Sequence, residues 1–174
     1  MPTRRHLLIS AAAGLTALAA ARRHALFFAP AAASDEAAGA RREGYEITHT
    51  DAEWRKLLTP EQYAVLREGG TERAYSSPLN DEHRSGIFAC AGCGLDLYSS
   101  RTKFDSHTGW PSFWAPLPHA VATGRDLSFG MLRTEVHCRR CGGHLGHVFD
   151  DGPPPTGLRY CMNGVALSFE PGAA

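Results

Sequence analysis

The chain is 174 residues long, carries 18 basic and 18 acidic side chains, and has a hydrophobic fraction of 43%. This length predicts a single domain with a sizeable core and room for one additional segment. Because the formal net charge is zero and no extended basic cluster occurs, neither nucleic acid nor a membrane surface is an expected partner.

The first 33 residues are predicted to be an export signal. They begin M-P-T-R-R-H, continue with an apolar run over Leu7–Ala21, and contain no acidic residue. The order T-R-R-H-L-L resembles a twin-arginine signal, which favours export to a bacterial periplasm. The alternative is an N-terminal membrane anchor, but a span needs about 20 apolar residues. Removal of the signal takes away four of the 18 basic residues, which leaves 14 against 18 acidic ones and a net charge of −4.

Two short helices are expected after the signal. Residues 34–44 have the composition of a linker, and residues 45–170 are expected to form the folded domain. Residues 50–53 (T-D-A-E) and 59–62 (T-P-E-Q) are each a capping box, the second with proline at the first helical position. The second helix should end at Gly69.

Beyond residue 86 the sequence changes to short apolar or alternating runs separated by glycine, proline, asparagine and aspartate. This pattern predicts a mainly β domain, built of antiparallel strands and preceded by the small helical part. The expected strands are Gly86–Cys90, Asp96–Tyr98, Met131–His137, His147–Phe149, Arg159–Asn163 and Val165–Phe169.

Four of the five cysteines form two C-x2-C pairs, Cys90 with Cys93 and Cys138 with Cys141. Glycines beside each pair favour tight turns that point two thiolates at one metal ion. We therefore expect one structural Zn²⁺ per chain, bound by all four cysteines and pinning two distant parts of the sheet structure. Such a closed site has no open position for a substrate. Two disulfides are the alternative, which an exported protein would permit.

The fifth cysteine, Cys161, has polar neighbours of the kind found in reactive sites. Arg159 and Asn163 would share its face of a strand, and Arg159 would supply positive charge to lower the thiol pKa. His144 and His147 follow the second cysteine pair directly, and histidine is suited to general acid catalysis. A buried structural thiol is the alternative for Cys161, and structural histidines are the alternative for the other two.

The segment 103–114, K-F-D-S-H-T-G-W-P-S-F-W, is rich in aromatic residues beside glycine and proline. An aromatic wall in a loop can hold a small apolar group such as a methyl. Trp110 is the strongest candidate for this role, and Phe113 is retained as a second substrate-binding candidate. Phe104, Phe113 and Trp114 also suit a loop that caps the core.

Together these motifs resemble the methionine-R-sulfoxide reductase B family. The resemblance rests on T-P-E-Q-Y-A-V-L-R-E-G-G-T-E-R, both cysteine pairs, T-K-F-D-S-x-x-G-W-P-S-F, H-L-G-H-V-F-D-D-G-P and R-Y-C-M-N, all in family order. It extends from Thr48 to Phe169. It implies a zinc-pinned pair of antiparallel sheets and the reduction of methionine-R-sulfoxide in proteins or peptides.

The resemblance also implies roles for individual residues. Cys161 matches the nucleophile that attacks the sulfoxide sulfur and becomes a sulfenic acid while methionine is released. Trp110 matches the residue whose ring receives the substrate methyl group. The histidines match the pair near the sulfoxide oxygen. The residues that match those orienting the site are Arg159, Asn163 and Asp151.

The sequence departs from many family members at Thr108, where they carry a resolving cysteine. Without that cysteine, a thioredoxin-like or other external thiol must reduce the sulfenic acid. Separately, the enzyme is expected to act as a monomer. Two other classes of function are considered. One is a non-catalytic ligand-binding module on a zinc-pinned β scaffold, against which the reactive-site pattern argues. The other is a zinc-ribbon nucleic-acid binder, against which the acidic mature chain argues.

Overall fold

The computed structural model of the protein describes residues 44–174. The predicted export signal, residues 1–33, lies outside the described residues, as does all of the predicted linker except its last residue. Within residues 44–174, no helix combines the length and apolar character needed to cross a membrane.

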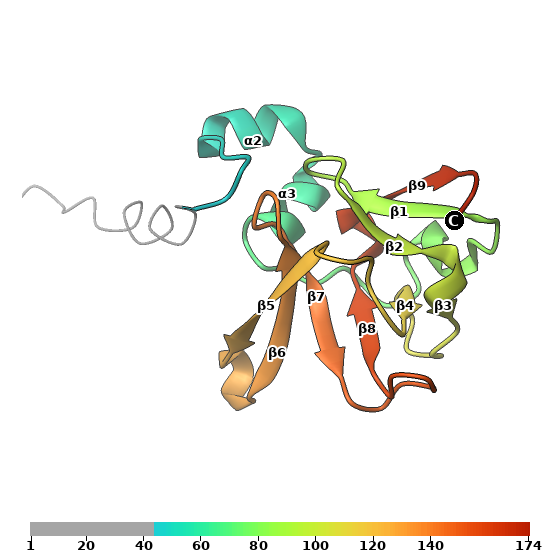
Figure 1. Ribbon diagram of the computed structural model, residues 1–174. Coiled ribbons are helices and arrows are strands. Elements are labelled where there is room, and N and C mark those ends of the chain that lie inside the picture. The colour runs from blue at the N-terminus through green and yellow to red at the C-terminus, as the bar shows by residue number, and fades with distance from the viewer. Residues whose placement is uncertain (1–43) are drawn as a thin grey trace, which may run out of the picture. The chain divides into compact units, whose positions relative to one another are not determined.

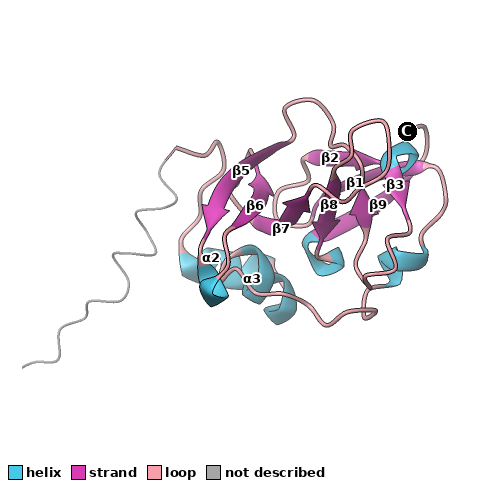
Figure 2. Cartoon of the chain, turned by 90° about the horizontal axis from the view of Figure 1, so that it is seen from below, coloured by secondary structure: helices cyan, strands magenta, loops and turns pink. Residues whose placement is uncertain are grey.

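Two short helices, α2 (Asp51–Leu57) and α3 (Pro60–Leu66), precede the strands. Each begins with the predicted capping box, in which the side chains of the first and fourth residues bond to each other's backbone amides. Trp54, Tyr63 and Leu66 are buried, so both helices contribute to the core. The two helices lie together on one side of the strands (Figures 1 and 2).

Four single turns of 3-10 helix connect other elements. They are η1 (Pro78–Asp81), η2 (Ser100–Thr102), η3 (Ser128–Gly130) and η4 (Gly164–Ala166).

The strands form two sheets, and every pairing is antiparallel (Figure 1). The smaller sheet has the order β2-β1-β9, with β1 (Gly86–Cys90) between β2 (Asp96–Ser99) and β9 (Leu167–Pro171). The larger sheet has six strands in the order β3-β4-β8-β7-β6-β5. Its strands are β3 (Lys103–Phe104), β4 (Ser112–Phe113), β5 (Val121–Asp126), β6 (Arg133–Cys138), β7 (His144–Phe149) and β8 (Arg159–Met162).

The predicted fold class, a mainly β domain of two antiparallel sheets behind short helices, is confirmed. The sequence did not predict β3 and β4, which are only two residues long, or β5, because V-A-T-G-R-D lacks the alternation of apolar residues that marks a half-buried strand. The last strand begins at Leu167 rather than Val165, because η4 occupies the preceding residues.

The core lies under the strand that carries the fifth cysteine. Tyr98 and Phe113 are fully buried and stacked, with ring centroids 4.3 Å apart. The Tyr98 hydroxyl donates a hydrogen bond to Met162 Sδ at 3.1 Å, which ties the smaller sheet to β8. Because successive side chains of a strand point to opposite faces, burial of Met162 turns Cys161 to the other face.

Candidate active site

A cavity of about 150 Å³ opens beside β7 and β8, and Cys161 lines it. Four of the residues predicted from the sequence meet in this cavity. It is lined by Thr71, Trp110, Arg133, Gly146, His147, Phe149, Cys161 and Asn163.

Cys161 sits in the middle of three neighbouring strands. It pairs with Ser112 of β4 on one side and with His147 of β7 on the other. Burial raises the pKa of the Cys161 thiol, while the Thr108 hydroxyl and the positive charge of Arg159 act in the opposite direction. Arg159 lowers the pKa of the Cys161 thiol as expected, but burial raises that pKa by more. The pKa of the thiol therefore lies above its ordinary value, a net direction opposite to the one that the charge of Arg159 alone would give.

A chain of hydroxyl groups leads to the sulfur of Cys161. Thr108 Oγ1 lies 3.9 Å from Cys161 Sγ. Ser106 Oγ lies 2.8 Å from the Thr108 hydroxyl and 2.7 Å from that of Ser112. The residue that replaces a cysteine of the resembled family thus faces the candidate nucleophile.

The two predicted histidines occupy different positions. His147 lies opposite Cys161 in the strand pairing and lines the cavity, whereas His144 is not among the lining residues. The centroids of the two imidazole rings are 5.4 Å apart. Burial lowers the pKa of His147, and its hydrogen bond with Asp126 opposes that shift. His147 Nε2 is 2.7 Å from Asp126 Oδ2, and His144 Nδ1 is 2.7 Å from Glu135 Oε1. His147 is thus better placed to exchange a proton with a bound substrate.

The carboxylate partners of the histidines come from β5 and β6, and sequence reasoning did not identify them. Hydrogen bonds from Ser128 and then from His147 hold the pKa of Asp126 well below its usual range. Asp126 Oδ2 also accepts a hydrogen bond from Arg133 Nη2 at 2.6 Å. The hydrogen bond with His144 lowers the pKa of Glu135. The alternating polar residues of R-T-E-V-H, residues 133–137, were the available signal.

Arg159 and Asp151 form a bidentate ion pair beside the cavity. Arg159 Nε donates to Asp151 Oδ1 at 2.8 Å, and Nη2 donates to Oδ2 at 2.7 Å. The guanidinium also lies over the Phe149 ring, 4.5 Å from its centroid. Asp151 is outside the cavity and fixes the position of Arg159.

Asn163 is buried, and its side-chain amide is occupied by backbone groups. Its Oδ1 accepts a hydrogen bond from the Glu72 amide at 2.9 Å, and its Nδ2 donates to the Leu145 carbonyl at 3.1 Å. Asn163 therefore fastens β8 to β7 and to the segment that follows α3. These contacts make it a positioning residue.

Glu72 is a further residue that sequence reasoning missed. Its carboxylate accepts hydrogen bonds from the backbone amides of Gly164 and Val165, at 2.5 and 3.0 Å. Its carbonyl accepts one from Trp110 Nε1 at 3.2 Å. Glu72 thus holds the indole ring at the cavity while it fixes the turn after β8. It occurs within the quoted T-P-E-Q motif segment, but no local pattern marked its role.

The aromatic residues of the 103–114 segment divide between the cavity and the core. Trp110 lines the cavity, as the sequence predicted. Phe113 is fully buried between Phe88 and Tyr98 and is absent from the cavity lining. Its position matches the core-capping alternative and gives it no contact surface for a substrate.

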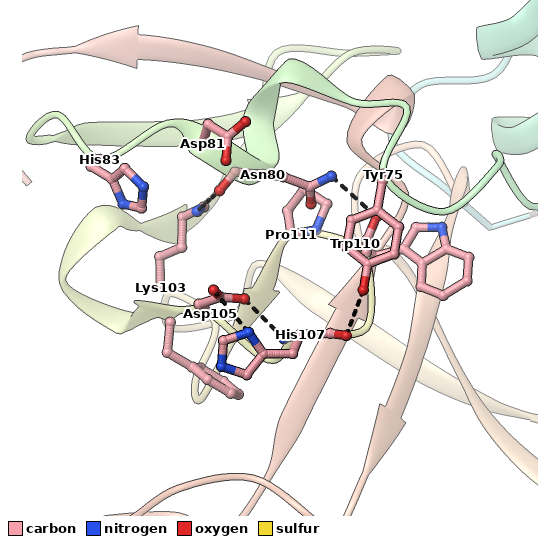
Figure 3. Close-up of a pocket in the computed structure, with 11 residues that line it drawn as sticks. Tyr75, Asn80, Asp81, His83, Lys103, Asp105, His107, Trp110 and Pro111 are labelled. Carbon is pink, nitrogen blue, oxygen red and sulfur yellow. Dashed lines mark hydrogen bonds and ion pairs between the residues drawn. The ribbon is translucent and has the colours of Figure 1, made fainter.

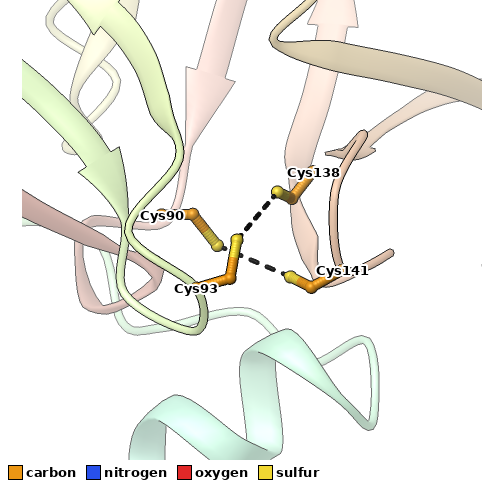
Figure 4. A group of neighbouring side chains, drawn as sticks. All are labelled: Cys90, Cys93, Cys138 and Cys141. Carbon is orange, nitrogen blue, oxygen red and sulfur yellow. Dashed lines mark hydrogen bonds between the residues drawn. The ribbon is translucent and has the colours of Figure 1, made fainter. Parts of the chain in front are cut away.

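The remaining four cysteines converge at the junction of the two sheets (Figure 4). Cys90 ends β1 and Cys138 ends β6, so each pair belongs to a different sheet. All four Sγ atoms lie within 4.8 Å of one another. Two contacts run between the pairs, at 3.7 Å for Cys90–Cys141 and 3.6 Å for Cys93–Cys138, and all four thiols are free. A tetrahedral ion with Zn–S bonds of about 2.3 Å requires sulfur separations of about 3.8 Å, so the cluster fits a metal ion.

Comparisons with known proteins agree on one family. The family model described as SelR domain matches residues 58–171. The peptide methionine sulfoxide reductase MsrB of Agrobacterium fabrum is 54% identical over 127 residues, which cover 72% of this chain and 94% of the relative. The MsrB of Thiobacillus denitrificans is 58% identical over 123 residues, covering 70% and 93%. That of Pseudomonas putida KT2440 is 56% identical over 127 residues, covering 72% and 97%.

Proposed function

The chain belongs to the SelR-domain family of MsrB peptide methionine sulfoxide reductases, and we propose that it reduces methionine-R-sulfoxide in proteins and peptides. The observation that carries this function is that Cys161, His147 and Trp110 line one cavity. The sulfur of Cys161 attacks the sulfoxide sulfur, the oxygen passes to Cys161, and methionine leaves. The products are methionine and a sulfenic acid on Cys161, so one thiol is oxidised by two electrons for each sulfoxide reduced.

The proton required at the sulfoxide oxygen is supplied within the site. Burial raises the pKa of Cys161 and lowers that of His147, which favours a proton on the sulfur and a neutral imidazole in the free enzyme. When Cys161 attacks, its proton moves to His147, whose charged form Asp126 stabilises. His147 then protonates the departing oxygen. The exchange is balanced and needs no external acid.

Trp110 and Arg159 orient the reaction. The Trp110 ring supplies an apolar wall for the S-methyl group of the substrate. Arg159 favours the Cys161 thiolate as it forms, and Asp151 holds the guanidinium in position. The preference for the R epimer rests on the family resemblance.

An external thiol regenerates the enzyme. Apart from Cys161, all cysteines of the chain belong to the four-thiol cluster, and Thr108 occupies the place beside Cys161 Sγ. Two thiols of a thioredoxin-like reductant restore Cys161, forming one disulfide and one water molecule.

The four-cysteine cluster binds one Zn²⁺ that has a structural role. All four ligand atoms come from the protein and their separations suit tetrahedral coordination, which leaves no position for a substrate. Bound metal stabilises the junction between the two sheets. Cys90, Cys93, Cys138 and Cys141 are the ligands.

The enzyme acts as a monomer in a bacterial periplasm. The proposed location rests on the sequence of residues 1–33, which has the charged start, apolar run and arginine pair of a twin-arginine signal. The twin-arginine route carries folded proteins, which would allow zinc to bind before the thiols meet an oxidising compartment.

The test of the proposed activity is the reduction of each epimer of N-acetyl-methionine sulfoxide and of a peptide methionine sulfoxide, with dithiothreitol as reductant. We expect turnover of the R epimer in both substrates, faster for the peptide, and none of the S epimer. If neither epimer is consumed by folded, metal-loaded protein, a non-catalytic ligand-binding module becomes the better description.

A further inference from the structure

A second cavity shares Trp110 with the catalytic cavity. It also has a volume of about 150 Å³, and Trp110 lines both cavities. Its walls come from the η1 segment, from β3 and from the loop that leads to Trp110 (Figure 3). Because both cavities border Trp110, a chain bound with its sulfoxide at Cys161 would pass near the second cavity.

The backbone around the second cavity is strained. Among the described residues, only three that are not glycine have a positive φ, and two of these, Tyr75 at 63° and His107 at 56°, line the cavity. The Tyr75 hydroxyl donates to the His107 carbonyl at 2.8 Å, and the Tyr75 amide donates to the Gly109 carbonyl at 2.7 Å. Strain of this kind is concentrated at functional sites.

Charged side chains give the second cavity its chemical character. Asp81 and Asp105 lie on opposite sides of the Lys103 ammonium (Figure 3). The ammonium already donates to the Asn80 carbonyl at 2.8 Å. Asp105 Oδ2 lies 3.1 Å from His107 Nδ1. With neutral histidines, two carboxylates and one ammonium leave a net charge of −1 on the lining.

The other ionisable groups nearby do not reverse this balance. Glu82 next to the cavity is paired with Arg84, whose Nη2 lies 2.5 Å from Glu82 Oε2, so the two charges cancel. At neutral pH the cavity therefore favours a cationic guest.

We propose that this second cavity is a subsite for the substrate polypeptide and receives a lysine or arginine side chain a few residues from the methionine sulfoxide. The inference rests on the proposed function, because it assumes that the sulfoxide occupies the cavity at Cys161. An extended chain advances about 3.3–3.6 Å per residue, so neighbours of the sulfoxide pass over Trp110. The carboxylates of Asp81 and Asp105 then recognise the cationic side chain.

The test uses the full chain and a set of peptides that contain one methionine-R-sulfoxide. Each peptide carries lysine, glutamine or glutamate at one position, from three residues before the sulfoxide to three after it. At one of these positions kcat/KM should fall from lysine to glutamine to glutamate. An exposed charge pair contributes about 0.2–1 kcal/mol, so we expect about a 1.4-fold to fivefold step per charge change at low salt. The preference should shrink in 0.5 M NaCl, where charges are screened.

Variants identify the residues responsible. Asp81→Asn should reduce the ratio of kcat/KM for the lysine peptide to that for the glutamate peptide, and Asp81→Asn combined with Asp105→Asn should bring it close to one. Asp96→Asn, which neutralises an exposed carboxylate on β2 away from the cavity lining, should retain the full ratio. The salt titration of the unmodified protein tests the same charge recognition if the double variant is unstable.

Three results would overturn the subsite. They are equal kcat/KM for all peptides, a preference for glutamate that would indicate recognition by Lys103, and a lysine preference that survives the double variant. Reduction of N-acetyl-methionine-R-sulfoxide separates this failure from failure of the proposed function. If that minimal substrate is reduced without any charge preference among peptides, only the subsite is wrong; if it is not reduced, the proposed function is.

Discussion

The chain uses the same side chain in two opposite ways, in the four-cysteine cluster and at Cys161. In the cluster, four thiols lie within 4.8 Å of one another at the junction of the two sheets. At Cys161 a single thiol faces a cavity lined by an indole and an imidazole. The four thiols of the cluster face one another and leave no opening for a substrate, whereas Cys161 borders a cavity that has room for one.

This difference shows that the neighbours of a cysteine decide its chemistry. Thiolates that converge on one point can bind a metal ion, and a metal-bound thiolate is no longer available as a nucleophile. A lone thiol that borders a cavity retains its reactivity; burial raises its pKa, and the Thr108 hydroxyl and the charge of Arg159 partly offset that shift. Substitutions that change one region and leave the other intact test the comparison.

The largest effect on activity is expected from Cys161→Ser. Serine keeps the size of the side chain but lacks a sulfur that can take up the sulfoxide oxygen, so turnover should be abolished. Metal content and the free energy of unfolding should remain those of the unmodified protein. Activity that persists in this variant would place the nucleophile elsewhere.

Cys93→Ser, in contrast to Cys161→Ser, should change the metal content and the stability of the protein. Loss of one of four ligands should release the metal and lower the free energy of unfolding by at least about 3 kcal/mol, because metal binding contributes to folding. Metal analysis and denaturant unfolding are the measurements, with Cys161→Ser as the matched control. Unchanged metal content and stability would rule out a structural metal site.

Asp126→Asn should slow single-turnover reduction by about tenfold, because it removes the carboxylate that favours charged His147. The pKa of His147, measured by NMR, should fall further below its ordinary value. Glu135→Gln is the matched control, since it removes the equivalent partner of His144, which lies outside the cavity lining. Equal losses in both variants would contradict the assignment of His147 as the acid.

Thr108→Val should lower the reactivity of Cys161 by a few-fold, and Thr108→Ser should restore it. Alkylation requires the thiolate, so its rate rises with pH until the thiol is fully ionised. Burial places this rise above the range of an ordinary thiol, and loss of the Thr108 hydroxyl should move it higher still. The pH dependence of alkylation by iodoacetamide measures the effect. A valine variant with an unchanged profile would show that the hydroxyl does not act on Cys161.

The smallest effect is expected from Asp151→Asn. Its carboxylate is 58% exposed and acts only through Arg159, so we expect a loss in kcat/KM of about twofold to fivefold. Because an isolated ion pair at the surface is screened by salt, the difference from the unmodified enzyme should narrow in 0.5 M NaCl. A loss of a hundredfold or more would indicate direct contact with the substrate.

The sequence predicted the parts of the molecule that local patterns specify. The capping boxes of α2 and α3 and the two cysteine pairs are such patterns, since their residues lie within four positions of one another. The polar pattern of R-Y-C-M-N likewise placed Cys161 on a strand with Arg159.

Contacts between distant segments could not be predicted in this way. Glu72 supports Trp110 and the turn after β8 from 38 and 92 residues away. Asp126 reaches His147 across the β5–β6–β7 part of the sheet, and β5 itself has too little apolar character to mark a strand. The lowering effect of Arg159 on the pKa of Cys161 was expected, but the net direction could not be predicted because burial, which only the folded chain determines, outweighs that charge.

The most direct test of the account is to mix reduced protein with one equivalent of a peptide methionine-R-sulfoxide in the absence of any reductant. Free thiols and peptide-mapped sulfenic acid would then be measured. The account predicts that one sulfoxide is consumed, that one thiol is lost, and that the sulfenic acid is on Cys161, with the four cluster thiols unchanged. Loss of two thiols, or oxidation of a cluster cysteine, would contradict the division of the five cysteines into one reactive thiol and four structural ones.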